Sequence, residues 1–117
     1  MNPNAAADPG LVYDMGRSDY VHYLCAMGYN NSAISRLTGQ QSTKCPVKQP
    51  SVLDVNLPSI TIPSLRNSTT VTRTVTNVGP ISSVYRAVIE PPVGTVVSVR
   101  PDVLAFNSRT KMISFTV

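Results

Sequence analysis

The segment at residues 69–79, TTVTRTVTNVG, constrains the fold of this chain more than any other. Val71, Arg73 and Val75 alternate with threonines, which places every second side chain on the same face of an extended backbone. The segment ends in Asn-Val-Gly, and both asparagine and glycine favour tight turns. This pattern predicts a β-strand with one buried face that ends in a turn, as in the sheets of all-β domains.

Short apolar runs on both sides extend the β pattern to most of the chain after Pro50. Residues that favour turns separate these runs at 77–80, 91–94, 101–102 and 107–110. The predicted strands are residues 52–55 with 60–62, 70–77, 84–90, 95–100, 103–106 and 113–117. An immunoglobulin-like sandwich has about seven strands, so we expect the chain to end before the final strand or hairpin.

The residues before about Gln49 follow a helical pattern instead. Ser18 is a candidate N-cap of a first helix, and Gly28 is placed to end that helix in a left-handed conformation. Ser32 and Gly39 bracket a second, shorter helix in the same way. The expected apolar faces are Val21, Leu24 and Cys25 in the first helix and Ile34 and Leu37 in the second. Two such short helices bury too little surface to fold alone, so we expect them to pack against another part of a protein.

The chain is mildly basic, with 10 Lys and Arg against 6 Asp and Glu, but the basic residues are spread almost evenly. Nucleic-acid surfaces need clustered basic residues or a docking motif, so we expect no nucleic-acid partner. No apolar run approaches the roughly 20 residues of a membrane span. The first residues do not begin a signal peptide, which has a basic segment followed by an apolar one. We therefore expect no membrane partner and no signal peptide in this chain.

Cys25 and Cys45 are the only cysteines, and their spacing fits no zinc site, because there is no CxxC pair and the single His22 cannot complete four ligands. We expect no metal and no cofactor. A disulfide is the better interpretation, since closing a loop of about 20 residues stabilises a fold by about 3 kcal/mol where the compartment is oxidising. Asn30, in NNS, and Asn67, in NST, are candidate N-glycosylation sites with the same requirement.

A series of motifs runs along nearly the whole sequence. They are NPNAAADPGLVYD at residues 2–14, DYVHYLCAMGYN at 19–30, ISRLTG at 34–39, the segment of Cys45, LDVNLPSITIP at 53–63 and TVTRTVTNVGP at 70–80. In order and spacing they resemble the C-terminal portion of plant subtilisin-like serine proteases, the subtilases. The resemblance implies that residues 1–49 are a helical tail of the α/β subtilisin-like catalytic domain and that residues 50–117 are a fibronectin type III-like β-sandwich. The expected fold class is thus mainly β.

The resemblance also bears on catalysis. The family's catalytic Asp, His and Ser and its oxyanion-hole Asn would precede Met1, so we expect no catalytic residue in this chain. The remaining candidates of suitable type are Asp14, Ser18, Asp19 and His22. The last three crowd one predicted helical turn without a nucleophile-elbow or oxyanion motif, whereas a triad needs a base within hydrogen-bond reach of the nucleophile.

The same resemblance implies further properties. The cysteines matching Cys25 and Cys45 are typically joined in this family, a closing β-hairpin would follow Val117, and family members are extracellular, in the apoplast or cell wall. We therefore expect an extracellular glycoprotein with one disulfide.

Motif order without a triad predicts the non-catalytic part of a subtilisin-like serine endopeptidase, in which the sandwich packs on the catalytic domain in cis, stabilises it and shapes its cleft. A different function is a free-standing binding module that docks in trans on a subtilase or another extracellular protein. Its surface would include Val21, Leu24, Ile34 and Leu37. A third alternative is an unproductive gene fragment, because a sandwich of fewer than about 70 residues is marginally stable.

Overall fold

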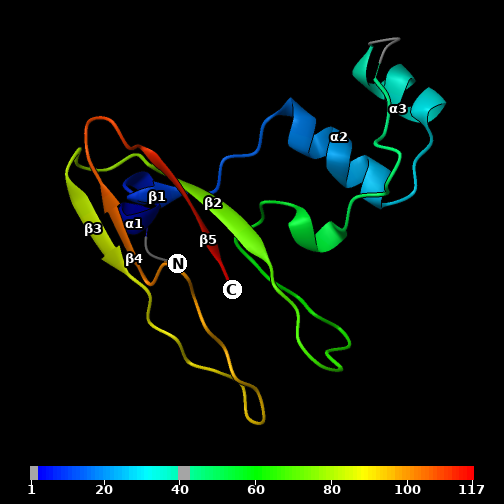
Figure 1. Ribbon diagram of the computed structural model, residues 1–117. Helices are drawn as coiled ribbons and strands as arrows, with labels where there is room; N and C mark the ends of the chain where they lie inside the picture. Colours follow the sequence, from blue (N-terminus) through cyan, green and yellow to red (C-terminus); the bar gives the residue numbers. More distant parts are fainter. Residues whose placement is uncertain (1–2, 40–42) are drawn as a thin grey trace. The chain divides into compact units, whose positions relative to one another are not determined.

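The computed structural model describes residues 3–39 and 43–117 (Figure 1). Contacts divide the chain into two compact units: Met1–Asp14 with Leu65–Val117, here called the sandwich unit, and Met15–Ser64, here called the disulfide unit. The elements in chain order are α1 (Pro3–Ala7), β1 (Leu11–Val12), α2 (Arg17–Ala26), α3 (Asn31–Thr38), the 3-10 helix η1 (Val52–Asp54), β2 (Thr72–Asn77), β3 (Ser83–Arg86), β4 (Val103–Phe106) and β5 (Met112–Thr116). The predicted domain boundary between residues 49 and 50, with a catalytic-domain tail before it and a fibronectin type III-like domain after it, stays a prediction.

The sandwich unit consists of two antiparallel sheets. One has the order β1-β2-β5 and the other pairs β3 with β4. Its buried cluster joins Val75 of β2 to Leu104 and Phe106 of β4, so the two sheets pack face to face. Partly buried side chains complete this core: Leu11, Tyr13, Tyr85, Ile113 and Phe115. The mainly β, sandwich-like fold expected from the sequence is confirmed.

Strand β2 has the burial pattern that its sequence predicts. Val71, Arg73 and Val75 are exposed by only 1%, 3% and 2%. The guanidinium Nη1 of Arg73 donates a hydrogen bond of 2.8 Å to the backbone carbonyl of Thr72, which offsets part of the cost of burying a charged group. On the opposite face the hydroxyls of Thr74 and its β5 partner Ser114 lie 2.8 Å apart in a hydrogen bond. The alternation therefore separates a buried face from a hydroxyl-bearing one.

Other predicted strands differ from the structure. The strand at 103–106 is confirmed as β4, while 84–90 is shortened to Ser83–Arg86. The prediction of strands at 52–55 and 60–62 was wrong: Val52–Asp54 is a 3-10 helix, because the Ser51 hydroxyl accepts the Leu53 N–H and starts a turn, and 60–62 forms no strand. The prediction of a strand at 95–100 was also wrong, because within this range only Arg100 forms a β-bridge, and its partner is Thr116.

Sequence reasoning missed strand β1. Leu11 and Val12 pair with Asn77 and Thr76 of β2, which adds the N-terminal segment to the sandwich sheet. Gly10, with φ +71°, leads into β1, and its carbonyl accepts hydrogen bonds from the Val78 and Gly79 N–H groups at 2.9 and 3.1 Å. The turn after β2 is thus held to the turn before β1.

Gly10→Ala should destabilise the sandwich by more than Gly94→Ala. Both glycines have positive φ, +71° and +81°, so each substitution carries a left-handed backbone cost of about 1–2 kcal/mol. At Gly10 a Cβ would also lie 2.7 Å from the Tyr85 hydroxyl oxygen, whereas at Gly94 it meets open space. Displacing Tyr85 adds about 0.5–1.5 kcal/mol. Urea unfolding of both variants measures the difference in stability. Equal losses of stability would contradict the close approach of Gly10 to Tyr85.

The two helices of the disulfide unit begin at residues other than those predicted. The prediction of Ser18 as N-cap was wrong, because Gly16 occupies that position and its N–H donates to Asp19 Oδ2 at 2.7 Å. Helix α3 starts after Asn30 rather than at Ser32, since the Asn30 Oδ1 accepts the Ala33 N–H at 2.8 Å.

The predicted helix ends and apolar faces are confirmed in part. Gly28 and Gly39 both follow their helices with positive φ, +87° and +68°, as predicted. Of the predicted apolar faces, Cys25 and Ile34 are buried, exposed by 3% and 1%, whereas Leu37 is 73% exposed.

Candidate functional site

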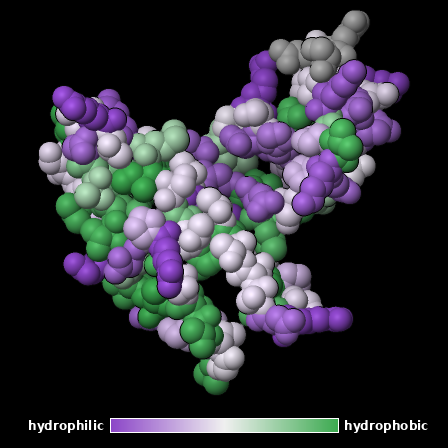
Figure 2. Space-filling view, viewed as in Figure 1, coloured by the Kyte–Doolittle hydropathy of each residue, from purple (hydrophilic) through white to green (hydrophobic). Residues whose placement is uncertain are grey.

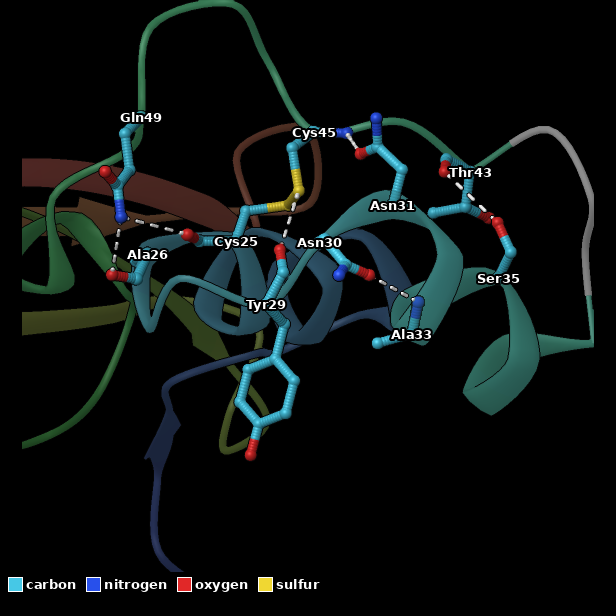
Figure 3. Close-up of a disulfide and its surroundings, with 10 residues drawn as sticks. All are labelled: Cys25, Ala26, Tyr29, Asn30, Asn31, Ala33, Ser35, Thr43, Cys45 and Gln49. Atoms are coloured by element: carbon cyan, nitrogen blue, oxygen red, sulfur yellow. Dashed lines mark hydrogen bonds between the residues drawn. A yellow bond between two sulfur atoms is a disulfide. The ribbon is translucent and has the colours of Figure 1, made fainter.

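The disulfide unit is centred on a bond between Cys25, near the end of α2, and Cys45 (Figure 3). Their Cα atoms lie 5.6 Å apart. The structure thus contains the disulfide that the sequence predicts, and neither cysteine is free. The bond fastens the segment after α3 back onto the end of α2.

Side-chain amides hold the same segment. Gln49 Nε2 donates to the carbonyls of Cys25 and Ala26 at the end of α2, at 3.3 and 3.2 Å, and the Cys25 carbonyl also accepts the Gly28 N–H at 3.0 Å. Asn31 Oδ1 accepts the Cys45 N–H at 2.8 Å (Figure 3). These contacts join one part of the chain to another, so we interpret this centre as structural.

Two of the residues of catalytic type, Asp19 and His22, line a pocket of about 250 Å³ in the disulfide unit, together with Ser51. Asp19 and Ser51 are engaged locally, because Asp19 Oδ2 accepts the Gly16 N–H and Ser51 Oγ accepts the Leu53 N–H. Ser18 is exposed on α2, and Asp14 lies outside this pocket lining. The described hydrogen bonds of Asp19 and Ser51 thus run to the backbone, and neither of them links a nucleophile to a base.

The described residues contain no group of three or more His, Cys, Asp or Glu side chains able to hold a metal ion. Within residues 3–39 and 43–117, no helix has the length and apolar character needed to cross a bilayer.

The most exposed apolar surface of the sandwich unit is the segment at residues 87–99, here called the arm. It leaves β3 and returns towards β4, as the yellow-to-orange loop in Figure 1. Val88, Val93 and Val96 in this segment are exposed by 86%, 105% and 99%. Figure 2 shows hydrophobic residues gathered at its tip. Isolated surface apolar residues are common, but a cluster of nearly fully exposed ones is typical of a docking surface.

A tight turn shapes the tip of the arm. The Thr95 N–H and hydroxyl both donate to the Pro92 carbonyl, at 3.1 and 2.7 Å, and close the turn predicted at 91–94. At the base the Ala87 N–H donates to the Asp102 carbonyl at 2.8 Å. The arm is therefore a defined projection with an apolar tip.

The docking surface predicted from the sequence was partly wrong. Ile34 is buried and cannot contribute to an exposed patch, and of the predicted residues only Leu37 is mostly exposed. The sequence signal for the arm was the run VGTVVSV after two prolines. A strand pattern accounted equally well for those valines, so their exposure was missed.

The sandwich architecture agrees with a comparison against protein families. Residues 54–117 match the family model described as fibronectin type-III domain, which is more than half of the chain. The chain belongs to the fibronectin type-III domain family. In this fibronectin type-III chain the matched region includes β2 to β5 and the arm.

Curated relatives of this fibronectin type-III chain are plant proteases. It is 59% identical to Subtilisin-like protease SBT3.15 and 60% identical to Subtilisin-like protease SBT3.4, both from Arabidopsis thaliana. Each match covers 100% of this chain and 15% of the relative. The resemblance to plant subtilisin-like proteases is thereby confirmed over the whole chain, which spans about 15% of the length of these relatives.

Proposed function

We propose that this chain is the non-catalytic C-terminal part of an extracellular subtilisin-like serine endopeptidase. Its fibronectin type-III domain docks on the protease domain in cis, stabilises that domain and shapes access to its cleft. The similarity to proteases of which this chain is 15% supports this context. The Cys25–Cys45 disulfide supports an oxidising, extracellular location.

The observation that carries the docking role is the exposure of the arm. Val88, Val93 and Val96 lie almost wholly in solvent in this chain. Burying a valine side chain contributes about 1.5 kcal/mol or more, so covering these three would provide a substantial part of a domain interface. An interface within one chain does not lose translational freedom on forming, and the arm therefore suits docking in cis.

We expect two charges in the arm to disrupt this docking. The test protein is a chimera in which this chain replaces the matching segment of Subtilisin-like protease SBT3.4, to which it is 60% identical. Burying an unpaired carboxylate costs several kcal/mol. Val93→Asp with Val96→Asp should therefore lower secreted peptidase activity by about tenfold or more, at about 1.4 kcal/mol per factor of ten.

Two controls make this experiment specific. Ser108→Asp adds a carboxylate at an exposed turn outside the arm and should leave activity unchanged. In the free chain the double valine variant should keep its urea midpoint, because substitutions at exposed positions change stability by about 0.5 kcal/mol or less. If the double variant and Ser108→Asp have the same activity in the chimera, the arm does not dock on the protease.

A further inference from the structure

The sequon at Asn67, Ser68 and Thr69 has no structural role within the described chain. All three residues are exposed, and they lie in an irregular segment between η1 and β2. Among the described residues, none of these three side chains makes a hydrogen bond, and none caps a helix or closes a turn. The first buried residue after them is Val71. Local folding therefore does not explain this Asn-Ser-Thr sequence.

The other sequon, at Asn30, is explained by local structure. The Asn30 Oδ1 accepts the Ala33 N–H and caps α3, and the neighbouring Asn31 Oδ1 accepts the Cys45 N–H beside the disulfide (Figure 3). Asn31 and Ser32 are already part of the helix. Residues 67–69, in contrast, lie in an irregular segment. Asn30 and Asn31 thus each have a structural role, as a helix cap and as a hydrogen-bond acceptor beside the disulfide.

We propose that Asn67 is an acceptor of an N-linked glycan. The inference rests on the proposed extracellular function, because the co-reactant, a lipid-linked oligosaccharide pyrophosphate, occurs in the secretory pathway. The Asn67 Nδ2 attacks the anomeric carbon of the first sugar and forms the N–C bond. The bond from that carbon to the pyrophosphate oxygen breaks, the lipid pyrophosphate leaves, and Nδ2 loses one proton to a base of the transferase.

The geometry around Asn67 allows this product without rearrangement. Its side chain is exposed and has no hydrogen bond among the described residues, so a sugar on Nδ2 replaces only solvent contacts. The segment at 65–70 contains no strand or helix, so no hydrogen bond between paired strands must break when this segment enters the active site of the transferase. Strand β2, with its pairing to β5, begins only at Thr72.

The test is secretion of the whole 117-residue chain behind a cleavable leader in yeast, followed by peptide mass spectrometry with and without endoglycosidase. The peptide that contains Asn67 should carry a glycan that the enzyme removes. Thr69→Ala should abolish it. Ser68→Ala is the matched control, because it changes the middle position and keeps the Asn-x-Thr motif, and it should remain glycosylated.

An Asn67 peptide that is unmodified in the secreted protein would overturn the proposal, as would a Thr69→Ala variant with the same glycan mass on that peptide. Ser32→Ala, which removes the other sequon and keeps the Asn30 cap, should leave the glycan at Asn67 unchanged. This experiment does not involve the arm. Failure at Asn67 and failure of docking are therefore distinguishable.

Discussion

Phe106→Ala should lower the free energy of unfolding of the sandwich unit by about 3–5 kcal/mol. Phe106 is 3% exposed and packs with Val75 and Leu104 between the two sheets. Its ring also meets that of Tyr85 edge to face, with centroids 5.8 Å apart and planes at 81°, an arrangement that aromatic pairs favour. Alanine would remove both contacts and leave a cavity where the sheets meet.

Urea unfolding of the free chain measures this loss. Ala105→Ser is the matched control, because Ala105 lies next to Phe106 on β4 with its side chain exposed on the opposite face. It should change stability by about 0.5 kcal/mol or less. Domains have a total stability of about 5–15 kcal/mol, so a loss of about 3–5 kcal/mol removes a large share of the stability of the sandwich unit. A loss below about 1 kcal/mol would contradict the central position of Phe106.

Replacing both cysteines, Cys25→Ser with Cys45→Ser, should destabilise the disulfide unit by about 3 kcal/mol in the chain-entropy model. The bond closes a loop with a sequence separation of 20 residues. Without it, hydrogen bonds hold the returning segment, chiefly those of Asn31 to the Cys45 N–H and of Gln49 to the end of α2. Such hydrogen bonds contribute only about 1 kcal/mol each, so the segment should open often.

Trypsin cleavage at Lys44 and Lys48 reports this opening, because both side chains are exposed and flank the returning segment. We expect cleavage there to be at least tenfold faster in the double serine variant, about 1.4 kcal/mol per factor of ten. Ser35→Ala is the control, because it removes only a 3.5 Å contact to the Thr43 carbonyl. Cleavage at the same rate in the double variant and the native chain would show that the disulfide does not hold this segment.

The sequence predicted those parts of the fold that depend on local pattern. The alternation in β2 and the sequence of β4 predicted buried faces that the structure contains, and glycines 28 and 39 predicted the left-handed helix ends. These features need only the period of a strand or the φ freedom of glycine.

The features that the sequence did not predict depend on contacts between residues that are distant in sequence. Leu11 and Val12 form a strand of 2 residues that exists only because β2 lies beside it, and Asn77, the partner of Leu11, is 66 residues further along the chain. Residues 95–99 have strand-forming valines but no partner strand among the described residues, so tertiary context overrides propensity there. A run as short as 2 residues has no detectable period.

The candidate site likewise has one part that the sequence predicted and one part that it did not. The cysteine pair could be predicted from spacing and family resemblance, and the structure joins Cys25 to Cys45. The exposure of the arm could not be predicted from the sequence, because it depends on where the sheets end. Val96 belongs to a run that suggests a buried strand, yet it is 99% exposed. Exposure of this kind follows from tertiary packing and is not encoded in the local pattern.

Hydrogen exchange in the arm tests the docking claim most directly. In the free chain only Ala87 and Thr95 among arm residues donate a described backbone hydrogen bond, so the amides of residues 88–90, 93, 94 and 96–99 should exchange rapidly. We expect the same amides to exchange at least about tenfold more slowly in the chimera with Subtilisin-like protease SBT3.4. Equal exchange rates in the free chain and the chimera would show that the arm stays in solvent and would contradict the proposed role.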